Sequence, residues 1–142
     1  MVTLAPAFGT NGVVNGAVVI SDTGSVGQQV LDVKGTAALP VSFAPTTLAF
    51  VAQNVATSST AQTVTLTNNL ATSLSPTIVG NADYAAAPGG ATPCTGTLAA
   101  HTKCTFTIVF TPTAIGRRTG AITVTDSANP GTQIMSLSGT GQ

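Results

Sequence analysis

The sequence predicts an all-β protein: an Ig-like, seven-stranded antiparallel β-sandwich, preceded by an N-terminal β-hairpin that repeats its last strands. Three observations support this fold class. Cys104–Pro112 alternates apolar and hydroxyl-bearing residues, turn residues interrupt the second half of the chain about every 8–12 positions, and residues 1–36 repeat the end of the chain. No long helical period competes with this pattern.

The alternating stretch is predicted to be the central core strand of the sandwich. Side chains on a strand point alternately to opposite faces of the sheet. One face therefore collects Cys104, Phe106, Ile108 and Phe110, while the other is mostly hydroxyl-bearing. Such a face has to pack against a second sheet, which places this strand inside a two-layered fold.

The remaining strands are assigned from short alternating runs bounded by turn residues. Seven strands in about 100 residues make one Ig-like unit. Proline cannot donate to a β-ladder, so Pro76 predicts an edge or a bulge in its strand. In chain order the predicted strands are Val41–Val51 (kinked at Pro45), Gln62–Thr67, Leu74–Val79, Asp83–Ala86, Cys104–Phe110, Ala121–Thr125 and Gln133–Ser138.

An internal repeat divides the chain into a partial module, residues 1–38, and a complete sandwich, residues 39–142. Gly116 follows Gly12 by 104 positions, and the same offset relates seven further identical pairs. A repeat of this period equals one Ig-like domain. The first members of the pairs are Gly12, Gly16, Ala17, Asp22, Gly27, Gln29, Gly35 and Thr36, and Val2, Leu4 and Pro6 echo Ile108, Phe110 and Pro112.

The first copy contains only terminal strands, predicted as a hairpin of Gly16–Ser21 and Gln28–Lys34. An isolated two-stranded hairpin is marginal in water, and its unpaired edges invite pairing. We therefore expect either the sandwich that follows or another subunit to hold it. The residues predicted to form this assembly hairpin are Val18, Val19, Ile20, Val30, Leu31 and Val33.

The composition argues for association and against nucleic acid. Hydrophobic residues make up 43% of the chain, charged residues only 6%, and the formal net charge is zero. Such a surface lacks the repulsion that keeps soluble proteins apart, so a homo-oligomer is expected. The four basic residues form no stripe that would neutralise phosphates. No apolar run is long enough to span a membrane, and we expect any export signal to have been removed or left out.

Several motifs together resemble the bacterial choice-of-anchor D repeats, relatives of the ASPM-SPD-2-Hydin Ig-like modules. The resemblance covers about Pro40–Gln142 as one full repeat and Val2–Thr36 as the tail of a preceding one. It implies a β-sandwich in exported, repetitive bacterial surface proteins, with no catalytic residues. Ala56 stands where such repeats often have glycine, so we expect a different turn after Val55. The motifs are Phe43–Pro45, Leu48–Phe50, Ala61–Asn68, Cys94–Leu98, Cys104–Pro112, Gly116, Gly120 and Ser136–Gly141.

The resemblance also implies a disulfide between Cys94 and Cys104, the only cysteines, since similar repeats often have a cysteine pair here. Two buried free thiols are the alternative. A disulfide would stabilise the fold by roughly 2–3 kcal/mol and would suit an oxidising, extracellular compartment.

No catalytic residue, cofactor or metal site is predicted. His101 has no nucleophile or carboxylate near it in sequence, and it is interpreted as a solvent-facing turn residue. Zinc prefers four ligands and calcium about six oxygens, and neither set is present. Asp22 and Asp126 are interpreted as turn-forming residues. Arg117 and Arg118 are interpreted as a solvated turn, with a subunit contact as the alternative.

The leading functional hypothesis is a non-enzymatic structural module of an extracellular bacterial assembly at the cell surface. Its hairpin would contact a neighbouring subunit by strand addition or by packing on the neighbouring sandwich. Because this join is head-to-tail, it could extend into a filament. An adhesin module that recognises carbohydrate or a host surface is a second hypothesis, weakened by the absence of Trp and the single Tyr. A slice of a longer surface repeat array is the third.

Overall fold

The computed structural model of the chain describes residues 12–20, 28–37, 39–126 and 132–142. Within these ranges the chain forms strands, turns and loops and no helix, which confirms the all-β fold class. The chain divides into two compact units, Met1–Leu39 and Pro40–Gln142. The predicted loop residues at 22 and 127–131, and the predicted echo at 2–6, lie outside the described residues. Asp126, predicted to form a turn, is instead the last residue of strand β9 (Gly116–Asp126).

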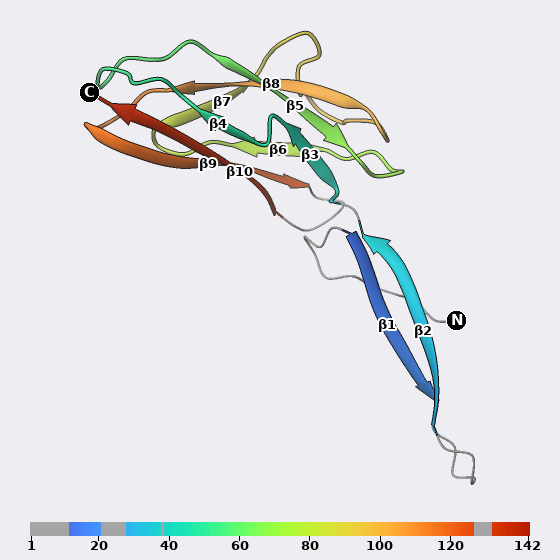
Figure 1. Ribbon diagram of the computed structural model, residues 1–142. Helices are drawn as coiled ribbons and strands as arrows, with labels where there is room; N and C mark the ends of the chain where they lie inside the picture. Colours follow the sequence, from blue (N-terminus) through green and yellow to red (C-terminus); the bar gives the residue numbers. More distant parts are fainter. Residues whose placement is uncertain (1–11, 21–27, 38, 127–131) are drawn as a thin grey trace. The chain divides into compact units, whose positions relative to one another are not determined.

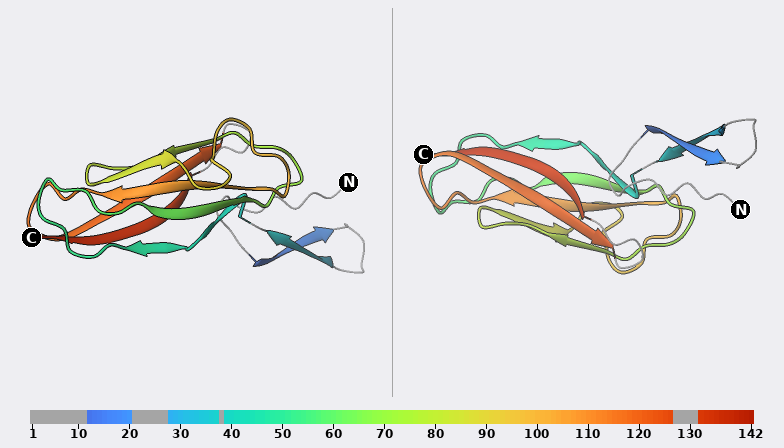
Figure 2. Two further views of the ribbon diagram at one scale, coloured as in Figure 1. Left: turned by 90° about the horizontal axis from the view of Figure 1, so that it is seen from above. Right: turned by 90° about the horizontal axis from the view of Figure 1, so that it is seen from below.

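The second unit is a sandwich of two four-stranded sheets (Figures 1 and 2). One sheet is antiparallel throughout and contains, in order, β3 (Val41–Ala44), β5 (Gln62–Asn68), β8 (Lys103–Phe110) and β7 (Tyr84–Pro88). The other contains β4 (Thr47–Ala49), β10 (Thr132–Gly141), β9 (Gly116–Asp126) and β6 (Pro76–Val79).

Strand β8 lies inside its sheet, between β5 and β7, as the alternating sequence predicts. The four residues of its predicted core face are buried, and Phe106, Ile108 and Phe110 are fully so. They form one hydrophobic cluster with residues of the opposite sheet, including Ile122 on β9 and Met135 on β10. Burial of a large apolar side chain stabilises the fold by about 1.5–3 kcal/mol, so this cluster is the main source of the sandwich's stability.

The predicted strand Val41–Val51 is wrong as a single element. It forms two strands in different sheets: β3 pairs antiparallel with β5, whereas β4 pairs parallel with β10. Pro45 lies between them, where its fixed φ and missing N–H interrupt the ladder. The described sandwich therefore has eight strands rather than seven, and one of its pairings is parallel.

Strand β9 begins at Gly116, five residues before the predicted Ala121. The prediction that Arg117 and Arg118 form a solvated turn was wrong, because both lie within β9 and pair with β10. The prediction for Pro76 is confirmed: it opens β6, which is the edge strand beside β9.

The turn after Val55 has a backbone conformation that suits glycine. Ala56 has a φ of 61°, in the left-handed region that L-residues with a Cβ occupy at a cost. Its N–H donates a hydrogen bond to the carbonyl oxygen of Pro112 at 2.9 Å, which holds the turn against the end of β8. The expectation of a different turn was therefore wrong.

The first unit contains an antiparallel hairpin of β1 (Gly12–Ile20) and β2 (Gln29–Ala37). Nine residues of each strand pair, from Gly12 opposite Ala37 to Ile20 opposite Gln29. The strands are longer than predicted, since both extend beyond Gly16 and Lys34 at the end of the hairpin remote from its turn.

Candidate interaction surface

The hairpin has two chemically different faces. Residues directly opposite one another in an antiparallel pair lie on the same face, and alternate residues along a strand share it. We name the apolar face by its residues: Val14, Gly16, Val18, Ile20, Leu31, Val33 and Gly35, with Gln29 at its end. We name the charged face by Asn15, Ala17, Asp32, Lys34 and Thr36, together with Val13, Val19 and Val30.

The six predicted assembly residues do not share a surface. Val18, Ile20, Leu31 and Val33 lie together on the apolar face, whereas Val19 and Val30 form a cross-strand pair on the charged face. The strand period explains this division, because neighbours in sequence point to opposite sides.

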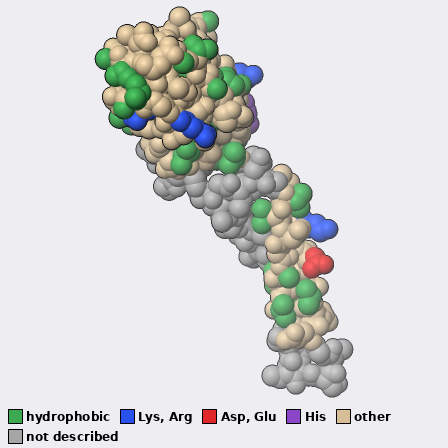
Figure 3. All heavy atoms as spheres, turned by 60° about the vertical axis from the view of Figure 1, so that its left-hand side comes forward, with side chains coloured by type: hydrophobic (Ala, Val, Ile, Leu, Met, Phe, Trp, Pro, Cys, Tyr) green, Lys and Arg blue, Asp and Glu red, His purple; other side chains and the backbone are tan. Residues whose placement is uncertain are grey.

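Large apolar side chains of the hairpin are exposed to solvent. On the apolar face Ile20 and Leu31 are 57% and 55% exposed, whereas Val14, Val18 and Val33 are half-buried. On the charged face Val13, Val19 and Val30 are exposed as well. Figure 3 shows apolar side chains distributed along the hairpin, beside one acidic and one basic side chain. Among the described residues no further strand pairs with this hairpin, and exposed apolar surface on such a strand pair is typical of an interaction site.

The same strand pair occurs inside the sandwich, where its apolar face is covered. Strand β9 pairs with β10 in the register that β1 forms with β2, shifted by 104 positions: Val18 opposite Leu31 matches Ile122 opposite Met135. All nine pairs of the hairpin recur in this way. Ile122 and Met135 are fully buried. The hairpin therefore has the pairing of a core hairpin together with the exposure of a surface element.

Two glycines on the core side of β9 and β10 make room for aromatic rings. A Cβ on Gly120 would collide with the ring of Tyr84, lying 2.6 Å from its Cε2 atom. A Cβ on Gly139 would lie 2.6 Å from Cε1 of Phe110. The rings of Tyr84 and Phe110 stack with their centroids 4.9 Å apart, and Phe50 packs against both. At these two positions only glycine permits such close contact.

An ion pair between a buried aspartate and a half-buried arginine fastens the start of β9 to the start of β7. Asp83 is only 6% exposed, and its Oδ2 accepts a 2.6 Å hydrogen bond from Nε of Arg118. Its Oδ1 accepts hydrogen bonds from the backbone N–H and the hydroxyl of Thr113, at 3.0 and 2.8 Å. The Arg118 hydrogen bond lowers the pKa of Asp83 below its ordinary value, although burial acts in the opposite direction. The carboxylate is therefore held charged and fully engaged.

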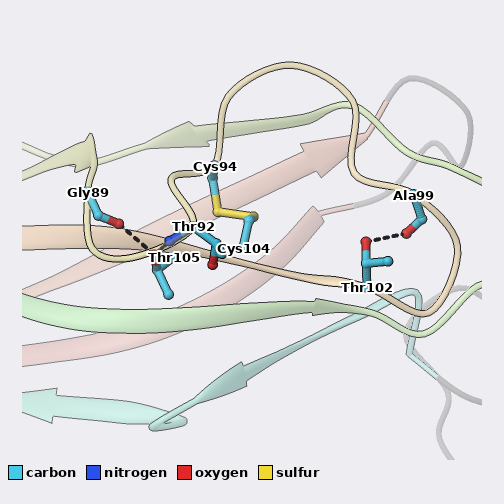
Figure 4. The surroundings of a disulfide bond; sticks show 7 residues. All are labelled: Gly89, Thr92, Cys94, Ala99, Thr102, Cys104 and Thr105. Carbon is cyan, nitrogen blue, oxygen red and sulfur yellow. Dashed lines mark hydrogen bonds between the residues drawn. A yellow bond between two sulfur atoms is a disulfide. The ribbon is translucent and has the colours of Figure 1, made fainter.

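A disulfide closes the loop that leads into β8. It joins Cys94 to Cys104, as the resemblance implied. Figure 4 shows Thr105 beside it, with its hydroxyl donating to the carbonyl oxygen of Gly89 at 2.6 Å. The N–H of Thr92 in turn donates to this hydroxyl at 3.3 Å. The loop is thus fixed to the start of strand β8 by a covalent bond and by hydrogen bonds.

No arrangement of catalytic groups occurs in the described part of the chain. His101 is an exposed turn residue with a φ of 55°. Among the residues described, no group of three or more His, Cys, Asp or Glu could hold a metal ion. The described ranges also contain no helix that could cross a membrane.

Sequence reasoning missed the two most connected polar residues of the sandwich, Asp83 and Asn68. The buried amide nitrogen of Asn68 donates to the carbonyl oxygens of Thr72, Leu98 and Ala99, at 2.9, 3.2 and 2.9 Å. Its Oδ1 accepts from the N–H of Leu70 at 2.9 Å. The sequence did contain a sign of the buried role of Asn68. It lies at the end of an alternating run, at an inward-facing position where an apolar residue would be expected.

Comparisons with known proteins agree with this architecture. A family model described as "Abnormal spindle-like microcephaly-assoc'd, ASPM-SPD-2-Hydin" (ASH) matches residues 32–134. None of the curated proteins compared matches the chain. Among solved structures, the chain is similar to the ASH/PapD-like domain 7 of human CEP192, with 17% identity and a TM-score of 0.51. That likeness covers 72% of this chain and 85% of the other.

Two further solved structures are similar at lower TM-scores. One is WR4, an MSP family member of C. elegans, with 14% identity and a TM-score of 0.45, covering 72% of this chain and 98% of that one. The other is the secreted serine protease VesC of Vibrio cholerae, with 18% identity and a TM-score of 0.47. The likeness to VesC covers 66% of this chain but only 21% of the protease.

The family match shows the general kind of protein, a non-enzymatic β-sandwich module. A bacterial origin stays a prediction. Because residues 32–134 are more than half of the 142 residues, the chain belongs to the ASH (ASPM-SPD-2-Hydin) family.

Proposed function

We propose that this protein is a structural module of an extracellular assembly at a bacterial cell surface, and that the β1–β2 hairpin joins it head-to-tail to a neighbouring subunit. The observation that carries the proposal is the hairpin itself. It pairs two nine-residue strands yet exposes large apolar side chains such as Ile20 and Leu31. A strand pair of this kind is marginally stable alone and gains stability when a partner covers it.

Strand addition suits this hairpin as a means of joining. The backbone N–H and C=O groups along the outer edges of β1 and β2, which pair with no other described strand, would supply main-chain hydrogen bonds, and alternate side chains would supply the contacts that give specificity. The chain has only 6% charged residues and no net charge, so little repulsion opposes the approach of a second copy. A contact between a hairpin and a different surface is not self-complementary, and it can therefore repeat along a filament.

The disulfide supports the extracellular location. Such bonds persist in oxidising environments and are rare in the cytosol. The bond between Cys94 and Cys104 ties the loop before β8 to the core, since Cys104 is buried and Cys94 packs against the hydrophobic cluster.

Sedimentation of the purified chain over a series of concentrations tests the proposal. The mean mass is expected to rise with concentration, and electron microscopy is expected to show fibres. Leu31→Lys places a charge on the apolar face and should shift the chain toward monomer. Thr36→Lys, which adds the same charge to the charged face, is the matched control and should associate as the wild type does. A chain that stays monomeric at every concentration contradicts the proposal.

A further inference from the structure

The apolar face of the hairpin repeats the core side of β9 and β10, position by position. Val18 corresponds to Ile122, and Leu31 corresponds to Met135. Even the polar position at the end of this surface is kept, because Gln29 corresponds to Gln133. Inside the sandwich most residues of this surface, including Ile122 and Met135, are buried beneath the sheet β3-β5-β8-β7, and Arg118 and Gly120 are half-buried. The sandwich thus indicates what kind of partner the hairpin surface fits.

Gly16 gives the most specific indication. It corresponds to Gly120, on which the ring of Tyr84 lies too close for any Cβ. Glycine within a strand weakens it by about 0.5–1 kcal/mol, and it often marks the close approach of another group. On a hairpin that stayed exposed, a glycine at this position would only weaken the strand.

Val14 indicates where the partner must differ from this chain's own sheet. It corresponds to Arg118, the residue that pairs with the buried carboxylate of Asp83. A sheet carrying an aspartate at this position would bury that charge opposite Val14 without its arginine. Loss of one member of a buried pair is strongly destabilising, so the partner sheet needs an uncharged residue there.

We propose that the apolar face of the hairpin is the docking surface for a four-stranded sheet of another ASH-type module, one that lacks its own terminal hairpin. The partner places an aromatic ring on Gly16 and carries an uncharged residue opposite Val14. This inference rests on the joining role proposed for the hairpin and names the partner of its apolar face. In an intact second copy the corresponding sheet is already covered by its own β9 and β10 and carries Asp83, so copies of this chain join by strand addition at the edges of the hairpin rather than on this face.

The test supplies such a sheet to the full chain. Residues 40–107 of this sequence are added directly before Val2, because Val2 echoes Ile108 and continues the same strand. Asp83 of the added copy is changed to Ser. Hydrogen exchange of the β1 and β2 amides is expected to become about tenfold slower or more than in the original chain. Equal exchange in the two proteins overturns the proposal.

Two valine substitutions separate docking from general strand stability. Valine favours strands, so Gly16→Val should slow exchange of the hairpin amides slightly in the original chain. In the extended protein the same change should speed their exchange, because the added Cβ blocks the ring. Ala17→Val, on the charged face, should change the exchange of the hairpin amides equally in both proteins. If Gly16→Val also slows exchange in the extended protein, no ring docks on this glycine.

A chimera keeps the proposal testable where the extended protein does not fold. Residues 12–37 replace residues 116–141 of the sandwich, with Asp83→Ser, since the two segments have equal length and register. The docking surface is supported if the chimera unfolds cooperatively and Gly→Val at the former Gly16 abolishes this cooperative unfolding. A chimera that stays unfolded overturns the docking surface. Self-association is measured separately. A monomeric chain whose hairpin is protected by the added sheet contradicts the homo-oligomer but not the docking surface.

Discussion

Reduction of the Cys94–Cys104 disulfide is expected to lower the free energy of unfolding of the sandwich by about 2.7 kcal/mol. The two cysteines are separated by 10 positions. In the chain-entropy model, closing a loop of about that length removes about 9 cal/mol/K of entropy from the unfolded chain, or about 2.7 kcal/mol at 25 °C. A domain of about 100 residues has an unfolding entropy of about 0.2 kcal/mol/K near its midpoint, so the midpoint should fall by about 12 °C.

Urea unfolding followed by circular dichroism measures this change on oxidised and reduced wild type. Comparing the two redox states keeps every buried atom except the bond itself, whereas a Cys94→Ala/Cys104→Ala variant would also remove sulfur atoms from the core. The m-value should stay nearly constant. A loss below about 1 kcal/mol would refute the entropic reasoning. It would mean that the loop is already held by its backbone hydrogen bonds, such as that from the N–H of Cys94 to the carbonyl oxygen of Thr105 at 2.8 Å.

Three further predictions concern single residues of the sandwich, each measured by urea unfolding. The pKa of Asp83 is lowered in the folded state, so its pairing with Arg118 stabilises the fold at neutral pH, and this contribution is lost as pH falls below about 4. Asp83→Asn should therefore lower the free energy of unfolding most at pH 7 and progressively less in acid. A loss of stability that does not depend on pH would argue against the ion pair. Ala56→Gly should stabilise by about 0.5–1 kcal/mol, since glycine relieves the left-handed φ, and destabilisation would mean that this strain is absent. Gly120→Ala should destabilise by about 1–3 kcal/mol because the new Cβ meets the ring of Tyr84, and a neutral result would show that the ring can move.

Alternation alone was enough to locate the centre of the fold. Phe106, Ile108 and Phe110 had to face a second sheet, and all three are fully buried. The position of Pro76 likewise predicted an edge strand, and β6 is one. These features depend on residues within one strand, so the sequence expresses them directly.

Pairings between distant residues could not be predicted in this way. The short strand β4 lies only two residues after β3, yet it joins the opposite sheet by pairing with β10 near the end of the chain. Arg118 was assigned to a solvated turn because arginine usually seeks water. Its partner Asp83 is 35 residues away in sequence, and only the packing of β7 against β9 brings the two together.

The candidate surface was predicted in part. The repeat identified the hairpin and its apolar residues, but it did not separate Val19 and Val30 from the apolar face. That separation follows from the register of β1 with β2. The importance of Gly16 became visible only after the ring of Tyr84 was seen on Gly120, because a sequence repeat does not state which side chain fills the space above a glycine.

Hydrogen exchange of the full chain at rising protein concentration tests most directly whether the hairpin is the joining element. Amides of β1 and β2 should exchange fast in dilute solution and become protected as the concentration rises. Amides of β8, inside the sandwich, should stay protected throughout and serve as the internal reference. The account would be contradicted if the amides of the hairpin were already fully protected from exchange in the dilute monomer and stayed equally protected at high concentration.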